Sequence, residues 1–195
     1  DTYVYRVGDG LDVVVDTAEV GDGNVLSFGP GIASTDLRLM VNGSSVVVGT
    51  GDPMHGVLLG NTRRNSITGT HDIDRVQTAD GTVLSYADLL ARGIDIVGTE
   101  GEDRLGGTSI GDRFVGKAGN DQLFGGAGHD HYRFNLGDGV DTIVDTASVA
   151  EGNEVIFGAG ITSSMLTLSL AQDSINSPTG QDLILRIGSG GDQLW

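Results

Sequence analysis

Residues 98–144 read, in blocks of nine, GTEGEDRLG, GTSIGDRFV, GKAGNDQLF, GGAGHDHYR and, after the extra pair FN, LGDGVDTIV. Each block has an aspartate at its sixth position and a branched or aromatic residue two positions later. The aspartates are Asp103, Asp112, Asp121, Asp130 and Asp141. A glycine-rich period of nine residues is typical of parallel β-helices, so this stretch predicts an all-β fold that contains a parallel β-roll.

The spacing within one block has a physical explanation. Six residues form a turn, in which glycine permits the positive backbone angles that other residues avoid. Three residues form a short strand, and its apolar side chain points inward because side chains alternate between the two faces of a strand. Two blocks complete one coil, so alternate turns stack along one edge of the roll. Their aspartates then lie close together, and they repel one another unless a cation lies between them.

Calcium suits such a stack best. It takes six to eight oxygen ligands from carboxylates and backbone carbonyls in a flexible geometry. Zinc is disfavoured, because the chain has no cysteine and its four histidines do not have the spacing of metal ligands. Magnesium is disfavoured as well, since it requires strict octahedral geometry and keeps several waters. We therefore predict Ca²⁺ as the bound ion, against the alternative of a glycine-rich β-solenoid without metal.

These blocks resemble the RTX (repeat-in-toxin, haemolysin-type) calcium-binding repeats of proteins exported by type I secretion. The resemblance implies that each ion lies between two alternate turns, held by the aspartates of both turns and by carbonyl oxygens. It implies three sites: Gly98–Asp103 with Gly116–Asp121, Gly107–Asp112 with Gly125–Asp130, and Gly116–Asp121 with Leu136–Asp141. The implied metal ligands are Gly98, Glu100, Asp103, Gly107, Ser109, Asp112, Gly116, Lys117, Ala118, Gly119, Asp121, Gly126, Gly128, Asp130, Gly137, Gly139 and Asp141.

Two departures from the family pattern weaken individual sites. Ile110 takes the fourth position of the second block, where the family has glycine. A β-branched residue is costly at positive φ, so we expect a distorted turn there. The extra residues Phe134 and Asn135 separate the fourth block from the fifth, and we expect them to weaken the third site.

An internal repeat frames the nonapeptides. Asp1–Asp16 returns as Asp130–Asp145 with an offset of 129 (130 − 1 = 129), and the match continues to Leu37 and Leu166. Because Asp1 corresponds to the sixth residue of a nonapeptide, we expect the chain to be a piece of a longer repetitive protein.

Two further motifs extend the resemblance. YxYxxGDGxD at Tyr3–Asp12 and IDRVQTADGTVL at Ile73–Leu84 resemble the haemolysin-type calcium-binding-related domain that often accompanies RTX repeats. The resemblance implies three parts: such a domain in residues 1–93, the β-roll in residues 94–145 and an incomplete second copy in residues 146–195.

Short apolar or alternating runs predict strands in the first part. They lie at residues 13–15, 25–28, 37–41, 46–48, 57–59 and 73–77. One helix is expected at Tyr86–Arg92. Ser85 is its N-cap, Asp88 completes a capping box and Gly93 ends it.

The amino-acid composition limits the classes of partner and site that the chain can have. The 195 residues include 33 glycines, no cysteine, and 27 acidic against 11 basic residues, for a formal net charge of −16. The absence of cysteine excludes disulfides, and the excess of acidic residues disfavours nucleic acid and anionic membrane surfaces as partners. No apolar run is long enough to span a membrane, and no N-terminal signal peptide is visible. Bound cations would offset part of the charge, and an acidic solvated surface accounts for the rest.

Other candidate sites are weaker. A second set of aspartates beside glycines would either hold ions or only form turns: Asp9, Asp12, Asp16, Asp138, Asp141 and Asp145. His129 and His131 flank Asp130, and we expect them to be solvated rather than to bind metal. The chain has no GxSxG, HExxH or P-loop motif, and its periodic aspartates lack the unique pair that a glycosidase uses.

We expect a non-catalytic calcium-binding module that folds when calcium binds, and the resemblance implies export from a bacterium by type I secretion. Glycine-rich turns lose much entropy on ordering and stacked carboxylates repel, so calcium binding would be linked to folding. Two alternatives remain open. One is a calcium-dependent adhesin or carbohydrate-binding module that contacts extracellular glycans or a cell surface, and the other is an accessory domain of a larger secreted hydrolase, lyase or toxin.

Overall fold

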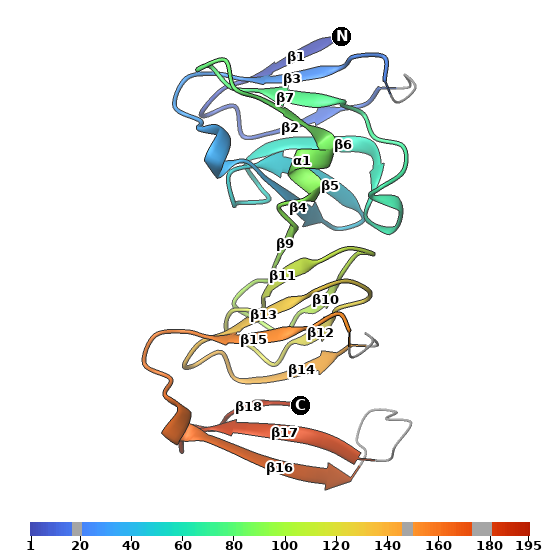
Figure 1. Cartoon of the computed structure of the whole chain (residues 1–195). Helices are drawn as coiled ribbons and strands as arrows, with labels where there is room; N and C mark the ends of the chain where they lie inside the picture. Colours follow the sequence, from blue (N-terminus) through green and yellow to red (C-terminus); the bar gives the residue numbers. More distant parts are fainter. Residues whose placement is uncertain (17–20, 146–149, 173–180) are drawn as a thin grey trace. The chain divides into compact units, whose positions relative to one another are not determined.

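The structure is a computed structural model, and it describes residues 1–16, 21–145, 150–172 and 181–195 (Figure 1). Across these residues it contains eighteen β-strands, three single-turn 3-10 helices and one short α-helix. The predicted all-β fold is therefore confirmed. None of the described helices is long and apolar enough to cross a membrane.

The chain forms two compact units. The first is Asp1–Ile96 with Thr108–Asp112, and the second is Val97–Gly107 with Arg113–Trp195. The three predicted parts are defined by similarity between segments of sequence, whereas these units are defined by packing. The three-part division therefore stays a prediction.

Two sheets build the first unit. The smaller has the order β1 (Thr2–Tyr5), β3 (Val25–Phe28), β7 (Arg75–Gln77) and β8 (Val83–Ser85), and its first three strands are parallel. The other has the order β2 (Leu11–Val14), β6 (Gly56–Arg63), β5 (Ser45–Gly49), β4 (Arg38–Asn42) and β9 (Ile94–Val97). Leu26, Leu39 and Val47 are fully buried apolar side chains of these sheets. Strand β8 is one that the sequence pattern did not indicate.

The single α-helix, α1 (Tyr86–Leu90), has the predicted capping box. The Asp88 N–H donates to the Ser85 hydroxyl at 3.1 Å, and the Ser85 N–H donates to the Asp88 carboxylate at 2.8 Å. The helix ends at Leu90, two residues before the predicted end, and the chain leaves it through a turn in which Gly93 has a φ of 77°.

The second unit contains the β-roll, which confirms the predicted parallel architecture. One parallel sheet consists of β10 (Arg104–Gly106), β12 (Gln122–Phe124) and β14 (Val140–Val144). The other consists of β11 (Asp112–Val115), β13 (His131–Phe134) and β15 (Glu154–Phe157). The eighth residues of the middle blocks, Phe114, Leu123 and Tyr132, are buried, and the rings of Phe114 and Tyr132 stack with centroids 5.0 Å apart.

Three further strands, β16 (Leu166–Gln172), β17 (Gln181–Ile187) and β18 (Asp192–Leu194), extend the sheet of β14. Strand β18 is parallel to β14 and antiparallel to β17 (Figure 1). Phe134, Ile187 and Leu194 form the buried cluster beneath them.

The internal sequence repeat is also a structural repeat. Strands β1 and β3 pair in the same register as β13 and β15, and every pair of partners keeps the offset of the sequence repeat. The antiparallel hairpin of β4 and β5 corresponds to that of β16 and β17, and the parallel pair of β2 and β6 to that of β14 and β18. The second copy therefore folds like the first over these strands.

Candidate metal centre

One edge of the β-roll is a stack of alternate turns. We number the turns by their blocks: the first is Gly98–Asp103, the second Gly107–Asp112, the third Gly116–Asp121, the fourth Gly125–Asp130 and the fifth Leu136–Asp141. Strands β10, β12 and β14, which follow the first, third and fifth turns, pair in parallel. The Asp103 N–H donates to Asp121 Oδ1 at 2.9 Å, and the Asp121 N–H donates to Asp141 Oδ1 at 3.0 Å. Three predicted ligand aspartates are thereby brought into one ladder.

The extra residues between the fourth and fifth blocks do not disturb this ladder. Phe134 extends strand β13, and the Asn135 N–H donates to the Asp138 carboxylate at 2.7 Å at the start of the next turn. Leu123 therefore still lies opposite Ile143 in the parallel pair. The third and fifth turns also touch through their backbones, since the Gly119 N–H donates to the Asp138 carbonyl at 2.9 Å.

The five turns fall into two conformational classes. In the third, fourth and fifth turns, the second and fourth residues have positive φ: Lys117 (73°), Gly119 (141°), Gly126 (99°), Gly128 (114°), Gly137 (89°) and Gly139 (104°). None of the residues of the first and second turns, all of which the structure describes, has a positive φ. We call the two classes open turns and threonine turns.

Threonine at the second position of the block accounts for the threonine turns. The Thr99 N–H donates to Asp103 Oδ2 at 2.5 Å, and the Thr108 N–H donates to Asp112 Oδ2 at 2.6 Å. The Thr108 hydroxyl also accepts the Ile110 N–H at 3.2 Å, as the Thr99 hydroxyl does for the fourth residue of its own turn. Ile110 is accommodated because this class of turn needs no positive φ at its fourth position. The distortion that we expected in the turn of Ile110 is therefore present in the first turn as well.

The open third turn offers what a cation needs. Asp121 is 1% exposed, and its Oδ2 atom is buried without a hydrogen-bond partner among the described residues. A Cβ atom on Gly119 would lie 2.6 Å from the Gly101 carbonyl oxygen, and one on Gly98 would lie 2.5 Å from the Gly116 carbonyl oxygen. Backbone oxygens of neighbouring turns thus crowd around the carboxylates, where only glycine fits. An oxygen-rich set with an uncompensated buried carboxylate fits a hard divalent cation such as Ca²⁺.

Burial and mutual repulsion disfavour the charged forms of Asp121 and Asp141 in this ladder. Burial raises the pKa of Asp121, and the nearby charges of Asp103 and Asp138 raise it further. Burial also raises the pKa of Asp141 to about 7, assisted by the charges of Asp121, Asp138 and Asp192. A cation beside these carboxylates would favour their charged forms and oppose both shifts.

Asp192 is a further acidic residue beside the fifth turn, and the sequence analysis missed it. It begins strand β18, and its Oδ2 accepts the Gly137 N–H of the fifth turn at 2.8 Å. The Gln193 N–H donates to the Gly139 carbonyl at 2.9 Å, which fixes this position. Sequence spacing contained a signal, since Asp192 is followed two residues later by Leu194, as in each nonapeptide.

The remaining predicted ligands lie as follows. Residues Gly107, Ser109 and Asp112 are in the second turn, and Gly126, Gly128 and Asp130 are in the fourth. Thr108–Asp112 belongs to the first unit and the fourth turn to the second unit, so the predicted site between these turns stays a prediction. Glu100 and Lys117, from the first and third turns, approach to 3.9 Å as an exposed ion pair.

Four aspartates of the second set have structural partners. Asp9 accepts the Arg6 N–H at 2.8 Å, as Asp138 does from Asn135. Asp16 accepts the Tyr3 hydroxyl, and Asp145 accepts the Tyr132 hydroxyl, each at 2.5 Å. These contacts recur at equivalent positions of the sequence repeat and show that the four carboxylates hold turns and strand ends in both copies.

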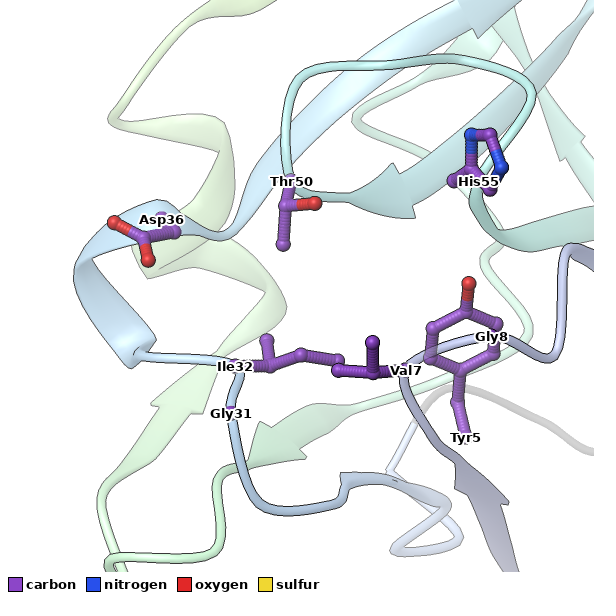
Figure 2. Close-up of a pocket in the computed structure, with 8 residues that line it drawn as sticks. All are labelled: Tyr5, Val7, Gly8, Gly31, Ile32, Asp36, Thr50 and His55. Carbon is purple, nitrogen blue, oxygen red and sulfur yellow. The ribbon is translucent and has the colours of Figure 1, made fainter.

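One pocket of about 330 Å³ lies in the first unit, and none of the nonapeptide aspartates is among the residues that line it. Figure 2 shows Thr50 on one side of it and Ile32 and Val7 on the other. His55 lies at its rim, and its Nδ1 is 2.9 Å from the Asp52 carboxylate. The pocket therefore joins an apolar floor to a small group of polar side chains.

Comparison with protein families agrees with the position of the turns in the sequence. The family model described as RTX calcium-binding nonapeptide repeat (4 copies) matches residues 106–143, which span the second to fifth blocks. Among solved structures, the chain is similar to the crystal structure of the extracellular lipase LipA from Serratia marcescens, with 14% sequence identity and a TM-score of 0.33. That match covers 99% of this chain and 35% of the lipase chain. No curated protein sequence matches the chain significantly. Residues 106–143 are therefore RTX calcium-binding nonapeptide repeats.

Proposed function

We propose that this chain is a calcium-binding module of a secreted protein, and that calcium binding drives the folding of its β-roll. The observation that carries the proposal is Asp121, a buried carboxylate with an oxygen that no described protein group satisfies. A buried unpaired charge is among the most costly features of a folded protein, and a bound cation removes that cost.

The best calcium site lies between the third and fifth turns. Both are open turns, and their aspartates Asp121 and Asp141 are linked by a hydrogen bond and buried. The first turn differs, because Thr99 already donates two hydrogen bonds to Asp103 Oδ2. A carboxylate oxygen that is satisfied within its own turn gains less from calcium, so we rank the site between the first and third turns second.

The coupling of calcium binding to folding follows from the properties of these residues. Without a cation, the carboxylates of Asp121, Asp138 and Asp141 repel one another in a water-poor edge of the roll. Glycines of the open turns also lose much conformational entropy on ordering. Calcium binds only the ordered stack, and it stabilises the folded state increasingly as its concentration rises.

This linkage suits a protein that leaves a cell before it folds. The calcium-poor cytosol would leave the roll unfolded for export, and the millimolar calcium outside would fold it. We propose a non-catalytic role for this part of the chain, in which any catalytic region of the parent protein lies elsewhere. Type I secretion from a bacterium is the route that the resemblance to RTX proteins implies.

A calcium titration followed by circular dichroism and calorimetry tests the proposal. The chain in chelator should gain β structure on addition of calcium. Asp121→Asn, which preserves shape and removes charge, should lower calcium affinity by roughly tenfold or more, since ligand charge sets affinity in calcium sites. Asp36→Asn, at an exposed aspartate of the first unit, is the matched control and should bind calcium like the wild type. Equal calcium binding by both variants would overturn the assignment.

The pocket of the first unit favours a second candidate function, the binding of a small sugar. Its floor of Val7 and Ile32 suits the apolar face of a sugar ring, and Thr50, Asp36 and His55 supply polar groups for hydroxyls. A glycan array read with and without calcium would test it. Binding that survives Asp121→Asn but is lost in His55→Ala would place sugar recognition in this pocket, and absence of binding to any glycan would remove the candidate.

A further inference from the structure

We propose that His129, His131 and Glu154 form a binding site for a transition-metal ion of the zinc class, separate from the calcium-binding turns. The ligand atoms of the three side chains all lie within 4.8 Å of one another. His129 Nε2 lies 4.0 Å from one carboxylate oxygen of Glu154, and His131 Nδ1 lies 3.9 Å from the other. Two imidazoles therefore face the two oxygens of one carboxylate.

The strand pairing of the second unit fixes this arrangement. His131 lies directly opposite Glu154 in the parallel pair of β13 and β15. The Glu154 N–H donates to the Asp130 carbonyl at 2.9 Å, which locks the register at this point. His129 precedes His131 by two residues, and their rings lie 4.6 Å apart. Side chains two residues apart along an extended chain share a face, so all three groups meet on one side of the strands.

The chemistry of the set selects the metal. Imidazole suits zinc, copper and nickel, whereas calcium takes oxygen ligands only. In a tetrahedral zinc site with bonds of about 2.0–2.1 Å, ligand atoms lie about 3.4 Å apart. The separations of 3.9 and 4.0 Å are close to this value, and small rotations of the half-exposed side chains would close the difference. Three protein ligands would leave one position for water or for an external ligand.

Metal binding at this site also depends on the negative charge of the Glu154 carboxylate. Arg113 is the basic residue that lies opposite His131 in the parallel pair of β11 and β13. Glu154 is the acidic member of the cluster, and it offsets the charge of a divalent ion there. Loss of this carboxylate should therefore weaken metal binding even if both histidines remain.

The fold itself does not require these residues. At the equivalent positions of the first copy, Thr2 lies opposite Val25 with the same strand pairing. The histidine and glutamate of the second copy are thus additions to a repeat that folds without them. Their metal would join the end of the fourth turn to β15, a strand whose residues Val155 and Ile156 are exposed.

Zinc binding to the calcium-saturated chain tests the proposal. Affinity is measured by competition with a chromogenic chelator, and cobalt replaces zinc for absorption spectra that report the coordination geometry. The wild type should bind a single zinc ion tightly. His131→Ala and Glu154→Gln should each lower the affinity by about tenfold or more, since even outer-shell changes at metal sites cost that much.

His55→Ala is the matched control, because His55 forms an exposed pair with the Asp52 carboxylate but lacks a third ligand among the described residues. It should leave zinc affinity unchanged. Circular dichroism and calcium titration of each variant separate a lost site from a lost fold, and Glu154→Gln at an exposed strand provides the test if a histidine variant misfolds. The proposal is overturned if the wild type binds no zinc in saturating calcium, or if His131→Ala, Glu154→Gln and His55→Ala bind it equally.

Discussion

Lys117→Gly is a substitution that we expect to stabilise the β-roll. Lys117 has a φ of 73°. Among the residues that the structure describes, it is the only non-glycine residue with a positive φ. At the second position of the open fourth and fifth turns, the equivalent residues are Gly126 and Gly137. In the third turn, therefore, a lysine takes the positive-φ conformation that glycine takes in the other two open turns.

The magnitude follows from two opposing effects. An L-residue in the left-handed region costs about 1–2 kcal/mol relative to its preferred conformation. Glycine removes that cost but loses about 0.5–1 kcal/mol through the greater freedom of the unfolded chain. The exposed pair of Lys117 and Glu100 at 3.9 Å contributes little, because surface ion pairs are worth about 0–1 kcal/mol. We therefore expect a net gain of about 0.5–1 kcal/mol, which corresponds to about 1–4 °C in the unfolding temperature of a chain of this length.

Calorimetry in saturating calcium measures this gain, with Lys117→Ala as the control. Alanine removes the charge but keeps the Cβ atom that makes positive φ costly, so its unfolding temperature should stay near that of the wild type. If alanine and glycine stabilise the roll equally, charge rather than backbone conformation controls the third turn, and the division into two turn classes loses its energetic basis.

Three other substitutions separate the calcium centre from the rest of the fold. Gly119→Ala would place a Cβ atom 2.6 Å from the Gly101 carbonyl oxygen, so calcium-induced folding should be lost or shifted to much higher calcium concentration in a circular dichroism titration. Normal calcium binding by this variant would contradict the close stacking of turns. Ser85→Ala removes the N-cap of α1 and should cost the first unit about 1 kcal/mol without a change in calcium affinity, measured by calorimetry and calcium titration. Burial alone would raise the pKa of Asp74, but three main-chain N–H donors hold that pKa below its ordinary value. Its stabilising effect is present above the ordinary carboxyl pKa and is lost as pH falls through the lowered value, so acid unfolding below about pH 4 should be less steep in Asp74→Asn, and an unchanged slope would refute this role.

Much of the fold could be predicted because it rests on local and periodic features. Aspartate and an apolar residue recur at fixed places in each nonapeptide, and these places set the parallel ladder that joins Asp103, Asp121 and Asp141. The internal sequence repeat predicted a second copy, and strand pairs with that same offset are present. The capping box of α1 is likewise a short-range pattern that the structure contains.

Other features depend on hydrogen bonds that the consensus pattern does not contain. Thr99 and Thr108 occupy positions where the family has glycine, and their N–H groups and hydroxyls bind the aspartates of their own turns. That substitution changes the class of the turn, and it also explains why Ile110 is tolerated. The division of turns therefore depended on side-chain contacts within a block, which spacing alone does not reveal.

Contacts between distant segments escaped prediction for a different reason. Asp192 reaches the fifth turn because β18 pairs with β14, and Glu154 meets the histidines because β15 pairs with β13. Each of these positions depends on a strand register across long stretches of sequence. The histidines lack the spacing of metal ligands in the sequence, and only the register supplies their third partner.

Calcium in the stack of open turns is the central claim, and anomalous diffraction tests it most directly. Crystals of the chain grown in calcium should give an anomalous calcium peak between the third and fifth turns, bounded by the carboxylates of Asp121 and Asp141. Asp121 Oδ2 should then coordinate the ion. A structure in saturating calcium with no peak between these turns, or with Asp121 Oδ2 bound only to protein groups, would contradict the account.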